Sequence, residues 1–190
     1  MQNHLSTQIN CDTIKTHQKK QRKGGIFLQQ PNLMIRPLCT GDRELIQSFY
    51  DDMGERSASF FNVARGNEMR TLEYLDNGRK NHLFWMAQAE ENGRPVAAGL
   101  VFIWDIQTSA VWLGVAVRDS MQGQGIGRRL LETVFAYCRE HRIGAVLLRT
   151  AYENLSAQKL YERCGFERIG HDGKGEYIYI KRFERTDLCL

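Results

Sequence analysis

The stretch that most constrains the fold is Val115 to Leu131, VAVRDSMQGQGIGRRLL, where an apolar run passes through closely spaced glycines into an amphipathic segment. Gly123, Gly125 and Gly127 lack Cβ atoms, so a ligand can approach the backbone closely at this turn. A helix that begins here has free N–H groups in its first turn, and the positive end of its dipole lies at the same place. The stretch therefore predicts a strand, a tight turn and a helix whose start binds an anion such as phosphate.

Two familiar phosphate-binding loops do not fit these residues. A Walker loop ends in Gly-Lys-Ser or Gly-Lys-Thr, whereas Gly127 is followed by two arginines and by no hydroxyl that would hold magnesium. The dinucleotide-binding fingerprint needs a glycine three residues after Gly125, where this chain has Arg128, and its acidic ribose ligand has no counterpart here. A glycine-rich turn of an ordinary α/β protein is the alternative interpretation.

Two segments resemble the signatures of the GNAT acetyltransferase superfamily. The sequence QGQGIG at 122–127 fits its pyrophosphate loop, written Gln/Arg-x-x-Gly-x-Gly/Ala. The segment Asn154 to Phe166, NLSAQKLYERCGF, resembles the second signature, in which an Asn opens a helix, a Tyr follows seven residues later and a Gly-Phe pair closes it. The two segments occur in the family's order and at its spacing, and the resemblance extends over roughly residues 33 to 183.

Hydrophobic periodicity and turn signals predict the remaining elements. Strands are expected near 33–37, 83–89, 96–104, 110–117, 145–150, 166–169 and 177–182, and helices near 40–53, 54–62, 68–79, 125–141 and after Asn154. This order agrees with an α/β (α+β) protein of the GNAT type, in which helices flank a mixed central sheet of about six to seven strands. In that fold a splayed central strand parts from its neighbour at a bulge and opens the acetyl-CoA cleft.

The net charge of +4 suggests nucleic acid until the charges are located. Residues 1–30 hold five of the 26 basic residues and one of the 22 acidic residues, so positions 31–190 are neutral with 21 of each sign. Nucleic-acid binding by the fold therefore loses its main support. We expect 1–30 to be a flexible basic tail, a solvated extension rather than a nucleic-acid arm, and 31–190 to form one acetyltransferase domain.

The cysteines and histidines do not predict a metal. The five cysteines are Cys11, Cys39, Cys138, Cys164 and Cys189. They are odd in number, widely spaced and without a Cys-x-x-Cys pair, which argues against a disulfide framework or a zinc site and favours a reducing compartment. The histidines show no metal-ligand spacing, and the longest apolar run, 96–104, is about half of a membrane span. We expect a cytoplasmic protein with no metal and no membrane contact.

The resemblance implies acetyl-CoA as co-substrate and a primary amine of a small molecule or protein as acceptor, in a monomer or homodimer. Residues 54–79 would form the acceptor wall. The residues that it places at acetyl-CoA are Val115, Ala116, Val117, Gln122, Gly123, Gln124, Gly125, Ile126, Gly127, Arg128, Asn154 and Tyr161. Backbone groups of Val115 and Val117 would bind pantetheine as a further strand, and the Val117 amide would stabilise the oxyanion.

The resemblance also assigns roles to two side chains. Tyr161 takes the place of the general acid that protonates the departing CoA thiolate, and a core tyrosine with a satisfied hydroxyl is the alternative. Asn154 would contact the pantetheine arm; a helix N-cap is the structural alternative, and both roles can hold. We expect Cys138 and Cys164 to be structural rather than nucleophilic.

The sequence does not identify a general base. The family position five residues before the Asn, a Glu in some members, is Arg149, and Asp105, Asp119, Glu153 or a water chain stay open. Two functions follow: acetyl transfer by direct attack of the amine in a ternary complex, or a non-catalytic acyl-CoA-binding module that has lost turnover. The complete loop and Tyr161 favour the enzyme.

Overall fold

The computed structural model describes residues 33–62, 64, 66–78 and 81–184. The expected tail at 1–30 lies outside the described residues. Its basic, flexible character and the boundary between tail and domain therefore stay predictions.

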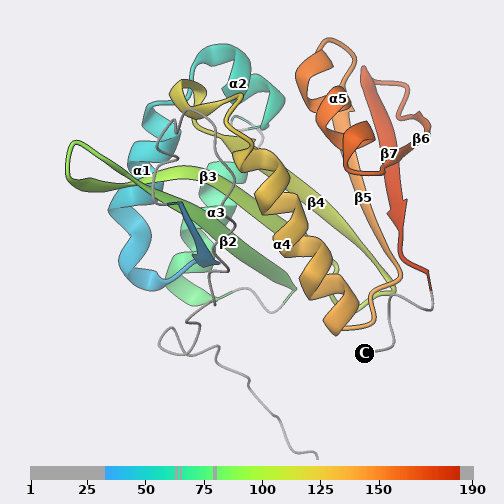
Figure 1. Cartoon of the computed structure of the whole chain (residues 1–190), viewed down its shortest axis with the longest axis horizontal. Coiled ribbons are helices and arrows are strands. Elements are labelled where there is room, and N and C mark those ends of the chain that lie inside the picture. Colours follow the sequence, from blue (N-terminus) through green and yellow to red (C-terminus); the bar gives the residue numbers. More distant parts are fainter. Residues whose placement is uncertain (1–32, 63, 65, 79–80, 185–190) are drawn as a thin grey trace, which may run out of the picture. The chain divides into compact units, whose positions relative to one another are not determined.

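A seven-stranded mixed sheet organises the described part of the chain, in the order β1-β2-β3-β4-β5-β7-β6 (Figure 1). The strands are β1 (Met34–Pro37), β2 (His82–Glu91), β3 (Arg94–Trp104), β4 (Ala110–Val117), β5 (Ala145–Ala151), β6 (Glu167–His171) and β7 (Glu176–Arg182). Strands β4 and β5 are parallel, and the other neighbouring strands are antiparallel. The expected mixed sheet is confirmed, and Asn92 and Gly93 form the predicted hairpin turn with φ of 52° and 74°.

The central strands part as expected. β4 and β5 pair only from Ala110 with Ala145 to Trp112 with Leu147, and both strands continue beyond that point. β4 stays paired with β3, whereas β5 pairs with β7 along its whole length and diverges with it. The bulge expected at this parting is not there: the register of β4 is continuous, and the shift near it lies between β2 and β3 at Ala87 and Gln88. β4 and β5 therefore separate where their hydrogen-bonded pairing ends, after Trp112 and Leu147, and without a bulge in β4.

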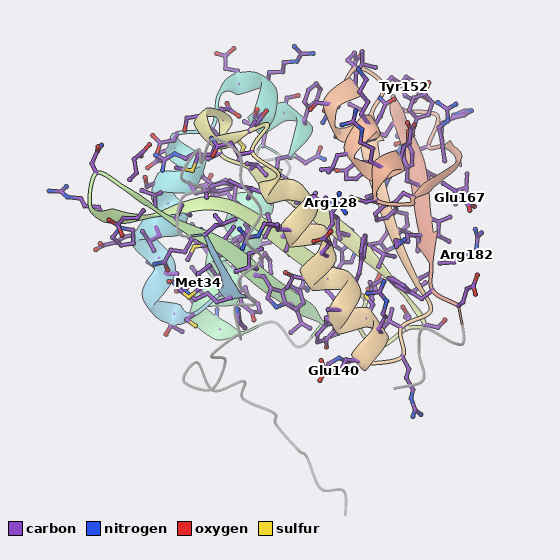
Figure 2. The ribbon with its side chains drawn as sticks, in the orientation of Figure 1. Met34, Arg128, Glu140, Tyr152, Glu167 and Arg182 are labelled. Carbon is purple, nitrogen blue, oxygen red and sulfur yellow. The ribbon has the colours of Figure 1, made fainter. Side chains whose placement is uncertain are left out.

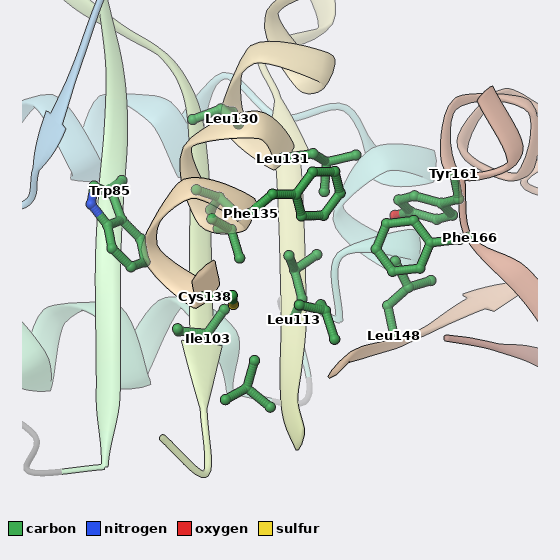
Figure 3. Close-up of a cluster of buried hydrophobic side chains, with 14 of the residues drawn as sticks. Trp85, Ile103, Leu113, Leu130, Leu131, Phe135, Cys138, Leu148, Tyr161 and Phe166 are labelled. Carbon is green, nitrogen blue, oxygen red and sulfur yellow. The ribbon is translucent and has the colours of Figure 1, made fainter. Parts of the chain in front are cut away.

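Helices cover both faces of the sheet. They are η1 (Thr40–Asp42), α1 (Arg43–Asp51), α2 (Glu55–Phe60), α3 (Asn67–Asn77), η3 (Asp119–Met121), α4 (Ile126–Glu140) and α5 (Leu155–Arg163). Helix α4 crosses one face, while α1 and α3 lie against the other (Figure 1). Side chains alternate along each strand, so β3 and β4 contribute to two hydrophobic cores. One core lies under α4 and α5 (Figure 3), and the other lies under α1 and α3.

Cys138 and Cys164 are free thiols, and burial raises the pKa of Cys138 to about 12, so this thiol stays protonated at neutral pH. Burial also raises the pKa of the half-buried Cys164 thiol. The expected absence of a disulfide framework and the reducing compartment stay predictions.

Two negative findings apply to the described residues. None of their helices is long and apolar enough to cross a membrane. Their His, Cys, Asp and Glu side chains form no group of three or more that could hold a metal ion.

Candidate functional site

A cleft of about 930 Å³ opens where β4 and β5 part. Its walls come from α2, the ends of β3 and β4, the loop at 122–127, the start of α4, β5 and α5. All the residues expected at acetyl-CoA line this cleft except Gln124, which is exposed in the loop. The structure thus brings together two motifs that are about 30 residues apart in the chain.

The N–H groups of Val115 and Val117 face the gap between β4 and β5. Arg118 N donates to Ala98 O at 3.0 Å, and Val117 lies opposite Gly99. In an antiparallel ladder this arrangement makes Val117 and Gly99 a non-hydrogen-bonded pair, so the Val117 N–H points away from β3. The alternation turns Val115 to the same side. Because pairing with β5 has already ended, neither N–H has a strand partner there.

The three loop glycines are required for two different reasons. Gly123 and Gly125 have φ of 76° and 79°, a left-handed conformation that costs any L side chain strain. A Cβ atom at either position would meet nothing within 4 Å, so the backbone is open to the cleft. At Gly127 a Cβ atom would lie 3.0 Å from Leu160 Cδ2. This glycine therefore allows α4 to approach α5 closely.

The start of α4 has the features of an anion site. The first helical hydrogen bond runs from Arg129 N to Gly125 O at 3.2 Å. The N–H groups of Ile126, Gly127 and Arg128 come before it and therefore have no partner within the helix. No side chain caps this end, and the first turn has no acidic residue. Arg128 is exposed beside it (Figure 2) and forms an ion pair with Glu132 at 2.8 Å. Free amides, helix dipole and cation all favour negative charge at this point.

Gln122 and Asp119 hold the loop in place. Gln122 Nε2 donates to Val117 O at 3.2 Å and to Asp119 Oδ1 at 2.9 Å. Asp119 also accepts from Gly54 N at 3.0 Å and from Ser57 Oγ at 2.6 Å. The carboxylate of Asp119 therefore ties the start of α2 to the loop, and it does not line the cleft. This leaves it poorly placed for the role of general base.

Asn154 caps α5. Its Oδ1 accepts a hydrogen bond from Ala157 N at 3.2 Å, which confirms the N-cap alternative. Asn154 also lines the cleft, so its contact with the pantetheine arm stays a prediction.

Tyr161 lies between the core and the cleft. Its side chain is part of the α4 core, with ring centroids 5.7 Å from Phe166 and 6.0 Å from Tyr179 (Figure 3). Burial raises the pKa of the Tyr161 hydroxyl, with smaller contributions from Cys164 and Tyr179. No hydrogen bond from another described residue contributes to this pKa. The ring therefore packs in the hydrophobic core. The hydroxyl is protonated at neutral pH, and no hydrogen bond to another described residue fixes its position.

Of the three carboxylates left open as general base, Glu153 alone lines the cleft. Asp105 accepts from Asn81 Nδ2 at 3.0 Å and does not line the cleft, whereas Glu153 does. Glu176, the first residue of β7, also lines the cleft and was missed by the sequence reasoning. It lies opposite Ala151 of β5 only because β5 and β7 pair, and no local motif indicates that pairing.

Aromatic residues of the sheet form the other side of the cleft and were also missed. The cleft is lined by Phe102 and Trp104 of β3 and Trp112 of β4, together with residues of α2. A Cβ atom at Gly114 would lie 2.5 Å from Phe102 Cζ, so the glycine lets this ring lie flat on β4. Seven residues of the segment 54–79 line the same cleft, and the role of that segment as an acceptor wall stays a prediction.

The chain is similar to known proteins in sequence and in structure. Residues 47–166 match the model of the Acetyltransferase (GNAT) family. The chain is 29% identical over 131 residues to a mycothiol acetyltransferase of Rhodococcus jostii, covering 69% of this chain and 36% of that protein. It is 26% identical over 112 residues to the N-acetylaspartate synthetase of Homo sapiens, covering 59% of this chain and 36% of that protein. The chain thus spans little more than a third of these relatives.

Solved structures share the fold at low sequence identity. The GNAT domain of S. lividans PAT aligns with a TM-score of 0.66 at 17% identity, over 78% of this chain and 89% of that chain. The PaiA N-acetyltransferase of Thermoplasma acidophilum, solved in complex with coenzyme A, aligns with a TM-score of 0.65 at 16% identity, over 80% of this chain and 99% of that chain.

Proposed function

This chain belongs to the GNAT acetyltransferase family, and we propose that it transfers the acetyl group of acetyl-CoA directly to a primary amine of a small molecule or protein. One observation carries the proposal: the gap between β4 and β5 and the unbonded amides at the start of α4 open onto one cleft. A thioester arm and a pyrophosphate, joined in one ligand, need those two features together.

In this proposal the backbone binds the co-substrate. Val115 and Val117 bind the pantetheine arm along the open edge of β4, and the amides between Gly123 and Arg128 bind the pyrophosphate. The Val117 N–H donates to the thioester oxygen and stabilises the negative charge that develops there. The unpaired, outward direction of this N–H supports the assignment.

The chemistry then needs two proton transfers. The neutral amine attacks the thioester carbonyl carbon, and the tetrahedral intermediate collapses with cleavage of the carbon–sulfur bond. Tyr161 gives its proton to the CoA thiolate; the residue lines the cleft, and burial raises the pKa of its hydroxyl, which keeps it protonated. The carboxylates of Glu153 and Glu176, which line the same cleft, are placed to take the proton of the amine, directly or through water. Asn154 orders the helix that carries Tyr161.

Two measurements test the proposal. Calorimetry should detect acetyl-CoA binding, and release of free CoA thiol with a panel of primary amines should detect turnover, with the acetylated amine identified by mass. Binding without turnover on any amine would favour the non-catalytic acyl-CoA-binding module instead. A protein that binds no acetyl-CoA would contradict both.

A further inference from the structure

A row of stacked aromatic rings ends in an arginine on the side of the cleft away from α4. Ring centroids of Phe102 and Trp104 are 5.6 Å apart, and those of Trp104 and Trp112 are 6.2 Å apart with an interplanar angle of 17°. Arg149 Cζ lies 5.1 Å from the Trp112 ring centroid. All four side chains line the cleft. The row offers a flat apolar surface with a positive charge at one end.

The sheet register explains this row. Phe102 lies opposite Gly114, Trp104 lies opposite Trp112, and Trp112 pairs with Leu147, two residues before Arg149 on β5. Cross-strand partners share a face, and alternate residues of a strand share a face. The row therefore lies on the α1 and α3 face of the sheet, opposite the face that α4 covers. It is separate from the predicted pyrophosphate site.

Arg149 is the cation of this row that is open to a ligand. Its side chain is exposed, and it forms no salt bridge with another described residue. Two backbone hydrogen bonds and, after them, the charge of Arg149 lower the pKa of the nearby Asp172 carboxylate. A guanidinium that stacks on an indole keeps its in-plane N–H donors free, and these match the two oxygens of a carboxylate. Other arginines line the same cleft outside the row, among them Arg56, which stacks on Phe60 of α2, and Arg70, which donates to Asn67 Oδ1.

A negative charge lies close to this positive one. Glu176 pairs with Ala151, two residues after Arg149 on β5, so Arg149 and Glu176 lie diagonally on one face of the sheet. Glu153 lines the same cleft. A small molecule with an ammonium group and a carboxylate complements this pair of charges. A phosphate, with more negative charge, would be opposed by the two carboxylates.

We propose that the acetyl acceptor is an amine that also carries a carboxylate, as an amino acid does. Arg149 binds its carboxylate, and Trp104 and Trp112 contact its apolar part. The inference rests on the proposed function, because it names the amine class that the same cleft takes.

The test uses two sets of matched amines, because the spacing between amine and carboxylate is a variable. One set is phenylalanine, phenylalaninamide and phenethylamine, and the other is 4-(aminomethyl)benzoate, 4-(aminomethyl)benzamide and benzylamine. The readout is kcat/KM from thiol release at saturating acetyl-CoA. In at least one set the carboxylate should exceed its amide by about 10- to 100-fold, the effect of a hydrogen bond between charged groups.

Arg149→Gln should abolish this preference. The variant should raise KM for the carboxylate, leave kcat/KM for the amide within about threefold, and keep the acetyl-CoA affinity of the parent. Arg168→Gln is the matched control, because Arg168 stacks on Tyr177 at 4.5 Å but does not line the cleft. It should keep the preference.

Three outcomes would overturn the inference and separate it from the proposed function. Amides or uncharged amines that equal the carboxylates in both sets would overturn it, and so would a preference that persists in Arg149→Gln. In both cases acetyl-CoA binding and thiol release would leave the proposed function standing. A parent protein that neither binds acetyl-CoA nor releases thiol with any amine would overturn both.

Discussion

Replacing Tyr161 with Phe separates chemistry from packing, because only its hydroxyl is removed. The ring would keep its contacts with Phe166 and Tyr179, and no described partner of the hydroxyl would lose a hydrogen bond. The free energy of unfolding should therefore change by less than about 0.5 kcal/mol. A lost general acid costs about 10²- to 10⁴-fold in rate, which is about 2.7 to 5.4 kcal/mol of transition-state stabilisation.

The direction of the pKa shift adds a constraint on pH dependence. Burial raises the pKa of Tyr161 above that of an ordinary tyrosine, so the hydroxyl is protonated throughout the neutral range. Activity of the parent should therefore show no loss through ionisation of Tyr161 between about pH 7 and 9.

Tyr179→Phe provides the matched control within the same core. Tyr179 is fully buried, and its hydroxyl donates to Glu162 Oε1 at 3.2 Å. Its loss should cost about 1 kcal/mol of stability, or about 2 to 4 °C in Tm, and spare kcat. The assays are thiol release with an accepted amine, acetyl-CoA calorimetry and thermal unfolding. Turnover by Tyr161→Phe within about threefold of the parent would refute the general-acid role and show that the thiolate leaves unassisted or is protonated by water.

Two further substitutions test the loop and the second helix. Gly125→Val should abolish acetyl-CoA binding measured by calorimetry, because it strains a residue with φ of 79° and fills the open approach to the α4 amides; Gly173→Val, with φ of 73° but outside the cleft, should keep binding. Parent affinity in a folded Gly125→Val protein would contradict the pyrophosphate assignment. Asn154→Ala should lower stability by about 1 kcal/mol through loss of the cap on Ala157 N, measured by denaturant unfolding. If the variant also loses more than about 1 kcal/mol of acetyl-CoA binding free energy, Asn154 contacts the pantetheine arm as predicted. Unchanged affinity would show that Asn154 acts only as the helix cap.

The sequence by itself determined the elements that depend on local patterns. The alternation in β4, the Asn92-Gly93 turn, the glycines before α4 and the Asn154 cap each act over a few residues, so each could be predicted without knowing the fold. The two motifs also predicted which residues would meet at the parting of β4 and β5.

Only the tertiary structure decided what faces the other side of that cleft. Glu176 lies near Arg149 because β7 pairs with β5, and Trp104 stacks on Trp112 because β3 and β4 keep one register. The state of Tyr161 is decided in the same way, since its pKa depends on burial by residues distant in the chain. Pairing and burial join residues that no short pattern connects, so the sequence alone predicted the loop and helix side of the cleft but not the side formed by Trp104, Trp112 and Glu176.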